Sequence, residues 1–106
     1  MFTNNKVISP QEAHRMMEEA NDYVLLDVRS PEEYREARIK GAKLLPVEEI
    51  ASRASLELPD KSVLIFVYCH SGMRAGRAVK ALGKMGYNNI FSFGGIINWP
   101  YGVVSG

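Results

Sequence analysis

Cys69 is the only cysteine in the chain, and it follows an apolar run over residues 63–68. The run is too short for an apolar helix, and its β-branched and aromatic content predicts a buried strand of a parallel sheet. Apolar residues then recur at helical spacing from Ala75 to Met85, and Gly86 supplies a helix stop. We therefore expect the thiol at a strand-to-helix turn, with backbone N–H groups of the next helix pointing toward its sulfur.

This position suits an anionic nucleophile. Unpaired N–H donors at a helix start, together with the helix dipole, stabilise negative charge. A thiolate is such an anion and is the reactive form of cysteine. The six residues from Cys69 to Arg74 can curl into an anion-binding nest, and Gly72 allows the positive φ that such a curl needs. We interpret Cys69 as a nucleophile; the alternative for a lone thiol is a buried structural role.

Four segments, taken in order, resemble the signatures of the rhodanese family of sulfurtransferases. They are residues 25–34, residues 39–42 with Pro46, the Cys-x-x-Gly-x-Arg loop at 69–74, and residues 94–99. The chain departs from the family's common pattern at Ala37-Arg38, where Gly-His is frequent, at Leu44-Leu45, where Asn-Ile is frequent, and at Ala75, where Ser is frequent. None of these departures involves the cysteine.

The resemblance implies that a sulfane sulfur moves from thiosulfate or a persulfide donor to a thiophilic acceptor through a Cys69 persulfide. The acceptor is cyanide, a thiol or a protein, and no metal or organic cofactor is required. Cys69 is the expected catalytic residue, and Asp27 and Arg29 are expected to brace the end of the sheet by ion pairing. The expected substrate-binding loop consists of His70, Ser71, Gly72, Met73, Arg74 and Ala75. Arg74 holds the loop, faces an anionic substrate, or does both.

Three other functions remain open. A cysteine phosphatase or arsenate reductase also uses a Cys-to-Arg anion loop, but the phosphatase families have one more residue in it and a His before the Cys, where this chain has Tyr68. A noncatalytic rhodanese-like module would bind a partner, although such modules often lose the loop cysteine. A thiol–disulfide cycle is the weakest alternative because the chain has no resolving cysteine.

Composition limits the partners and the size of the protein. A chain of 106 residues has room for one core, so we expect residues 1–106 to form a single rhodanese-like domain. Thirteen basic and twelve acidic residues create no large field for nucleic acid or an anionic membrane, and neither is an expected partner. No apolar run is long enough to span a bilayer, and a reactive thiol suits a reducing compartment, so a cytoplasmic location is expected.

Strand and helix patterns alternate along the chain, which predicts an α/β fold with a parallel sheet. The expected strands cover residues 6–8, 23–28, 42–45, 63–68 and 90–93. Helix starts are expected after Ser9 and Ser30, and further helices over residues 47–54 and after Arg74. The sequence therefore predicts about five strands, mainly parallel, with helices on both faces. Ligands bind at the carboxyl ends of such strands, where Cys69 is expected.

Overall fold

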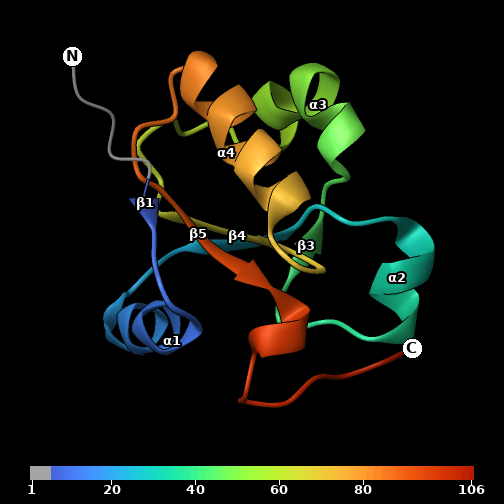
Figure 1. Ribbon diagram of the computed structural model, residues 1–106. Coiled ribbons are helices and arrows are strands. Elements are labelled where there is room, and N and C mark those ends of the chain that lie inside the picture. Colours follow the sequence, from blue (N-terminus) through green and yellow to red (C-terminus); the bar gives the residue numbers. More distant parts are fainter. Residues whose placement is uncertain (1–5) are drawn as a thin grey trace.

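The computed structural model describes residues 6–106. Within them, one sheet contains five strands in the order β1-β5-β4-β2-β3, and every neighbouring pair is parallel (Figure 1). The strands are β1 (Lys6–Val7), β2 (Val24–Asp27), β3 (Lys43–Leu44), β4 (Ile65–Cys69) and β5 (Ile90–Gly95). The longer strands lie inside the sheet and the two-residue strands lie at its edges.

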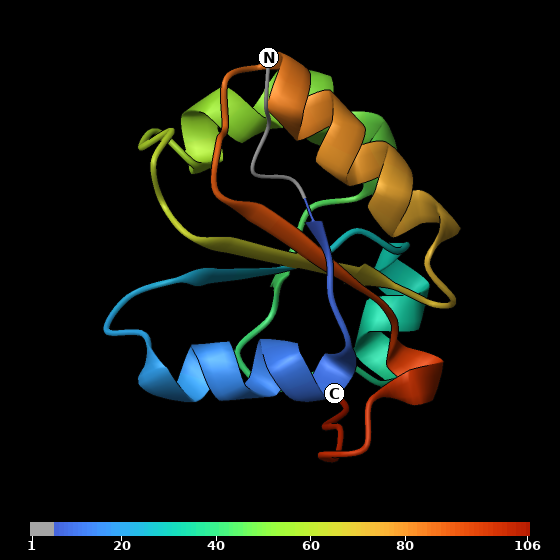
Figure 2. The ribbon, with the colours of Figure 1, turned by 60° about the vertical axis from the view of Figure 1, so that its left-hand side comes forward.

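Helices cover both faces of this sheet. They are α1 (Pro10–Glu19), α2 (Pro31–Glu36), η1 (Val47–Glu49), α3 (Ile50–Glu57), α4 (Met73–Lys84) and η2 (Ile96–Asn98), where η marks a 3-10 helix. Figure 2 shows α3 and α4 on one side of the sheet and α1 on the other, with α2 near the turn that joins β4 to α4. The predicted α/β architecture is confirmed.

Two Ser-Pro sequences start helices, as expected, but in different ways. The Ser30 side chain accepts a hydrogen bond from the Glu33 N–H, and the Glu33 carboxylate accepts one from the Ser30 N–H, which forms a complete capping box. The Ser9 side chain accepts from the Glu12 N–H, but the Glu12 carboxylate pairs with Arg15 instead of returning to the cap. The capping motif therefore forms fully at α2 and by one half at α1.

The central strand β4 is buried on both faces and connects two apolar cores. Ile65, Val67 and Cys69 belong to the core beneath α3 and α4. Phe66 and Tyr68 belong to the core beneath α1. Because side chains alternate along a strand, this single apolar run fills both cores and holds Cys69 in a fixed position.

The element boundaries differ from the predicted ones in two informative places. Residues 47–49 form η1 before α3 begins, and α3 continues to Glu57. Strand β5 continues past Phe93 to Gly95, since Gly95 pairs with Cys69 beyond a register shift. Among the described residues, no helix is long and apolar enough to cross a membrane. The expected domain of residues 1–106 includes residues 1–5, which lie outside the described residues.

Candidate active site

Cys69 is the last residue of β4, at the carboxyl end of the central strand, and three loop residues separate it from α4. The expected strand-to-helix turn is therefore present. The thiol lies beneath the loop, with 1% of the residue exposed. Its Sγ accepts a hydrogen bond from the Gly72 N–H at 3.0 Å. This N–H lies at the start of α4 and is the type of donor that stabilises negative charge on sulfur.

Glycines shape the loop from both sides. Gly72 has a φ of 125°, so the positive φ expected at this position is confirmed. Gly95 at the end of β5 lies directly against the loop, because a Cβ atom there would be 1.8 Å from the His70 carbonyl oxygen. The Ile97 N–H also donates to that oxygen, at 3.3 Å. The loop from Cys69 to Arg74 is thus supported by the junction of β5 and η2, and only a glycine at position 95 leaves room for this contact.

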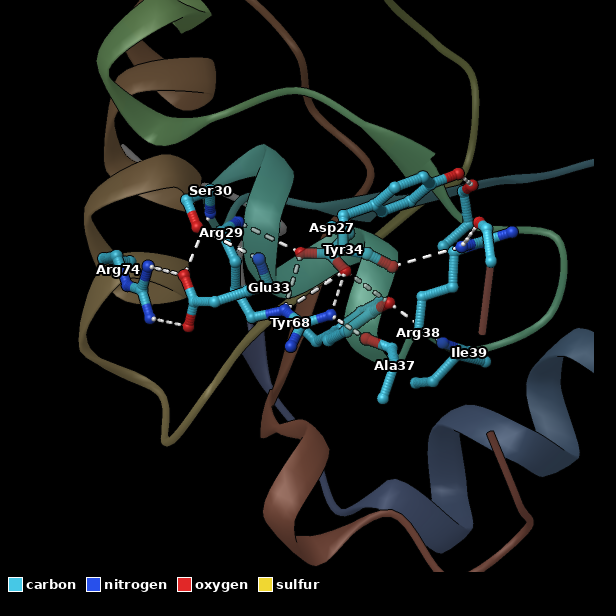
Figure 3. Close-up of polar contacts among 12 residues, drawn as sticks. Asp27, Arg29, Ser30, Glu33, Tyr34, Ala37, Arg38, Ile39, Tyr68 and Arg74 are labelled. Atoms are coloured by element: carbon cyan, nitrogen blue, oxygen red, sulfur yellow. Dashed lines mark hydrogen bonds and ion pairs between the residues drawn. The ribbon is translucent and has the colours of Figure 1, made fainter. Parts of the chain in front are cut away.

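Arg74 is held by a carboxylate from another helix. Its Nη1 and Nη2 atoms donate to Glu33 Oε1 and Oε2 at 2.7 and 3.0 Å, and Figure 3 shows the two groups facing each other. The hydrogen bonds from Arg74 lower the pKa of Glu33 to about 2, with a further contribution from Ser30 and against the effect of burial. Glu33 is therefore ionised throughout the neutral range. The geometry gives Arg74 a clear role in holding α4 against α2.

A second polar network lies behind the loop. The Arg29 side chain donates to the Asp27 carboxylate, with Nη2 at 2.6 Å from Oδ2, and these residues are 4% and 0% exposed. The Tyr68 hydroxyl donates to Asp27 Oδ2 at 2.7 Å and accepts from the Ile39 N–H at 3.1 Å (Figure 3). Burial raises the pKa of Tyr68, so its hydroxyl stays protonated and can act as this donor. Arg29 also donates to the Ala37 carbonyl oxygen at 2.6 Å. The network ties the residue before Cys69 to the segment after α2.

The remaining loop residues differ in exposure. His70, Ser71 and Met73 are exposed, and Met73 reaches 83%. Ala75 is fully buried against the core beneath α3 and α4, which fits a small apolar residue where the family often has Ser. The structure therefore gathers Cys69, its loop and Arg74 at one end of the sheet, with Asp27 and Arg29 behind them.

Sequence reasoning assigned no site role to Glu33. Glu33 was covered only by the predicted helix start after Ser30, and its contact with Arg74 spans a sequence separation of 41 residues. Local patterns cannot predict a pairing of this range. Nothing in the sequence indicated that Glu33, at the start of one helix, would contact Arg74, at the start of another.

A separate hollow of about 310 Å³ opens beside α1 and includes no loop residue in its lining. His14 contributes to it and stacks on Tyr101 with ring centroids 3.8 Å apart. Tyr101, which covers His14, lies 87 positions further along the chain. Among the described residues, no group of three or more His, Cys, Asp or Glu side chains is arranged to hold a metal ion.

Comparisons with known proteins identify the family. The family model of the rhodanese-like domain matches residues 9–100, so the chain belongs to the rhodanese-like domain family. It is 37% identical over 71 residues to the thiosulfate sulfurtransferase PspE of Escherichia coli, covering 67% of this chain and 68% of that protein. It is 35% identical over 94 residues to a sulfurtransferase of Allochromatium vinosum, covering 87% of this chain and 85% of that one.

Solved structures show the same fold. A rhodanese with anions from E. coli superposes with a TM-score of 0.75 at 33% identity, covering 80% of this chain and all of that one. Some relatives are much longer, and the chain spans 28% of the tRNA uridine(34) hydroxylase of Bdellovibrio bacteriovorus. The shared part is thus the rhodanese-like domain alone.

Proposed function

We propose that the protein is a sulfurtransferase that carries a sulfane sulfur on Cys69. Its relatives named as sulfurtransferases support this role in general terms. The observation that carries the specific proposal is the hydrogen bond from the Gly72 N–H to Cys69 Sγ within a loop that contains no second thiol. An N–H donor directed at the sulfur supports a nucleophilic role for Cys69 in addition to its place in the core.

The proposed reaction has two steps, each an attack on sulfur. The Cys69 thiolate attacks the outer sulfur of thiosulfate, the bond between the two thiosulfate sulfurs breaks, and sulfite leaves with the bonding electrons. The product is a Cys69 persulfide anion, whose charge the loop N–H groups stabilise. Cyanide or a thiolate then attacks the outer sulfur of this persulfide. Thiocyanate or a new persulfide leaves, and the Cys69 thiolate is regenerated.

The size of the loop supports sulfur over phosphate as the transferred group. The segment from Cys69 to Arg74 has six residues, one fewer than the phosphatase loop, and should therefore enclose a smaller anion. The thiol is also nearly buried, which suits a donor that presents a single sulfur atom. The guanidinium of Arg74 is engaged by Glu33, which supports the loop N–H groups as the main charge stabilisers.

The test is intact mass spectrometry after incubation with thiosulfate. Wild type should gain the mass of one sulfur atom, and dithiothreitol should remove it. Cys69→Ser should never gain it. An unmodified wild-type mass under excess donor would contradict the enzyme and favour the noncatalytic binding module.

A further inference from the structure

One face of α4 carries a row of four exposed side chains, three of them basic. Met73, Arg77, Lys80 and Lys84 are all exposed and follow one another at spacings of four, three and four residues. These spacings place all four on one side of a helix. At 1.5 Å per residue the row extends about 17 Å along the helix, starting at the active loop. In Figure 1, α4 runs away from the turn after β4. We call these four residues the basic row.

The cations of the basic row have no partners among residues 6–106. Arg15 on α1 pairs with Glu12 and Glu19. Arg53 likewise pairs with the carboxylates of Glu49 and Glu57, before and at the end of α3. By contrast, α4 contains no acidic residue, and none of Arg77, Lys80 and Lys84 forms an ion pair with a described residue. Three positive charges are therefore presented to solvent without compensation.

The start of the basic row lies beside the reactive sulfur. Met73 directly follows Gly72, whose N–H donates to Cys69 Sγ. A second exposed apolar residue, Ile97, is 58% exposed, and its N–H donates to the carbonyl oxygen of His70 in the same loop. Exposed Met and Ile side chains beside a buried nucleophile offer apolar contact area to anything that approaches the thiol. A molecule that reaches Cys69 over Met73 also lies against the cations behind it.

We propose that the basic row, with Met73 at its reactive end, is the docking surface for an acidic protein segment that bears the sulfur-accepting thiol. The proposal rests on the proposed sulfurtransferase function and specifies the class of its acceptor. Carboxylates on the segment complement the three unpaired cations, which speeds association and fixes the direction of approach. Cyanide needs no such surface. A protein fits better than a nucleic acid or a membrane because the charge is confined to one helix of a chain with a net charge of +1, and because Met is typical of protein interfaces.

The experiment measures sulfur transfer from persulfidated protein to three acceptors. Two are synthetic peptides with one Cys each, followed by a run of glutamates or of serines, and the third is cyanide. The test variant is Arg77→Glu/Lys80→Glu. The matched control is Arg35→Glu/Lys40→Glu, which makes the same change in net charge at two exposed residues that also form no ion pair among the described residues.

For wild type, we expect the glutamate peptide to react about tenfold faster than the serine peptide at low salt, with the advantage lost at high salt. The test variant should lose this preference, the control should keep it, and all three proteins should transfer sulfur to cyanide at similar rates. If wild type transferred sulfur to cyanide but reacted with the two peptides at equal rates, the docking proposal alone would be overturned. If wild type failed to transfer sulfur to cyanide as well, the proposed function itself would fail. If the peptides reacted equally and the test variant lost binding to a single-stranded RNA probe, the basic row would serve a nucleic acid instead.

Discussion

At the scale of single residues, one carboxylate connects two helices and the loop. Glu33 Oε1 accepts from the Ser30 N–H at 3.0 Å and from Arg74 Nη1 at 2.7 Å. The same side chain therefore closes the first turn of α2 and fixes the first turn of α4. Because Cys69 and Arg74 are the two ends of the proposed active loop, we expect Glu33 to act on the proposed site as a positioning residue rather than a reacting one.

Replacing Glu33 with Gln should loosen this connection. The variant keeps a hydrogen-bonding side chain of similar size but loses the ion pair, so we expect a stability loss of about 1 kcal/mol at neutral pH. Persulfide formation on Cys69 should slow by up to about tenfold, because small displacements of reacting groups are costly. Urea unfolding and the rate of mass gain with thiosulfate measure the two effects. Glu32→Gln, an exposed neighbour on the same helix turn, is the control and should change neither.

The pH dependence of this effect has a definite sign. The pKa of Glu33 falls from 4.5 to about 2 in the folded protein, so ionised Glu33 stabilises the fold. This stabilisation is complete above the unfolded pKa and is lost as the pH falls from about 4.5 toward 2. The stability difference between wild type and Glu33→Gln should therefore shrink over that interval. A difference that stays constant down to pH 2 would mean that the carboxylate charge does not act.

Tyr68 makes a different kind of contribution, because its hydroxyl is buried between a donor and an acceptor. Tyr68→Phe leaves the Ile39 N–H without its partner and removes one donor from the Asp27 carboxylate. Because buried polar groups are then left unsatisfied, the free energy of unfolding should fall by about 1–3 kcal/mol, as measured by urea unfolding. Tyr23→Phe is the matched control, since Tyr23 is 38% exposed, and its stability should stay close to that of wild type. Equal stabilities for the two variants would contradict the importance of the network.

At the scale of elements, the junction of β5 and η2 supports the proposed active loop through contacts with His70. Gly95→Ala adds a Cβ 1.8 Å from the His70 carbonyl oxygen. Neither atom can move away without a shift of its own backbone. The loop must therefore move, and we expect sulfur transfer to fall by at least about tenfold. Gly76→Ala on α4 is the control, because a Cβ there meets no atom within 4 Å. It should retain activity and gain up to about 1 kcal/mol of stability from helix propensity. Full activity in Gly95→Ala would show that the loop tolerates displacement.

Elements with strong local signals were predictable from sequence. The apolar run that became β4, the Ser-Pro helix starts and the helical spacing of α4 each gave the right type of element and placed Cys69 at a strand end. Element boundaries were less accurate where tertiary contacts decide them. β5 continues through Gly95 because β4 offers a partner beyond the register shift at Cys69. The strand therefore extends through two glycines, residues that local propensity assigns to turns.

The parts of the site that sequence reasoning missed depend on long-range contacts. The sequence indicated only a helix start around Glu33, and the fold brings its carboxylate to Arg74. Tyr101 stacks on His14 of α1 from the far end of the chain, and no local pattern indicates this contact. The basic row lies on one helix and its spacing was visible in the sequence. Its lack of ion-pair partners became visible only when the neighbouring side chains were placed.

At the scale of the whole molecule, β4 makes the two cores depend on each other. Its side chains alternate between the core beneath α3 and α4 and the core beneath α1. A strand that is buried on both faces cannot leave one core while it remains in the other. We therefore expect residues 6–106 to unfold as one cooperative unit, which is the physical meaning of a single domain.

Ile65→Ala tests this coupling, because Ile65 is fully buried in the core beneath α3 and α4, whereas the tryptophan Trp99 packs against the other core. Truncating the buried Ile65 side chain to its Cβ atom should lower the free energy of unfolding by about 2–5 kcal/mol. If the two cores unfold together, Trp99 fluorescence and far-UV circular dichroism should report one coincident urea transition, shifted to lower urea by the same amount.

Val7→Ala on the edge strand β1 is the control, since Val7 is 83% exposed and its replacement should change stability by no more than about 0.5 kcal/mol. A fluorescence transition that stayed at the wild-type midpoint while the circular dichroism transition shifted would separate the cores. The reactive loop would then depend only on the core that contains Cys69 and Ala75, and substitutions on the α1 face would leave sulfur transfer unaffected.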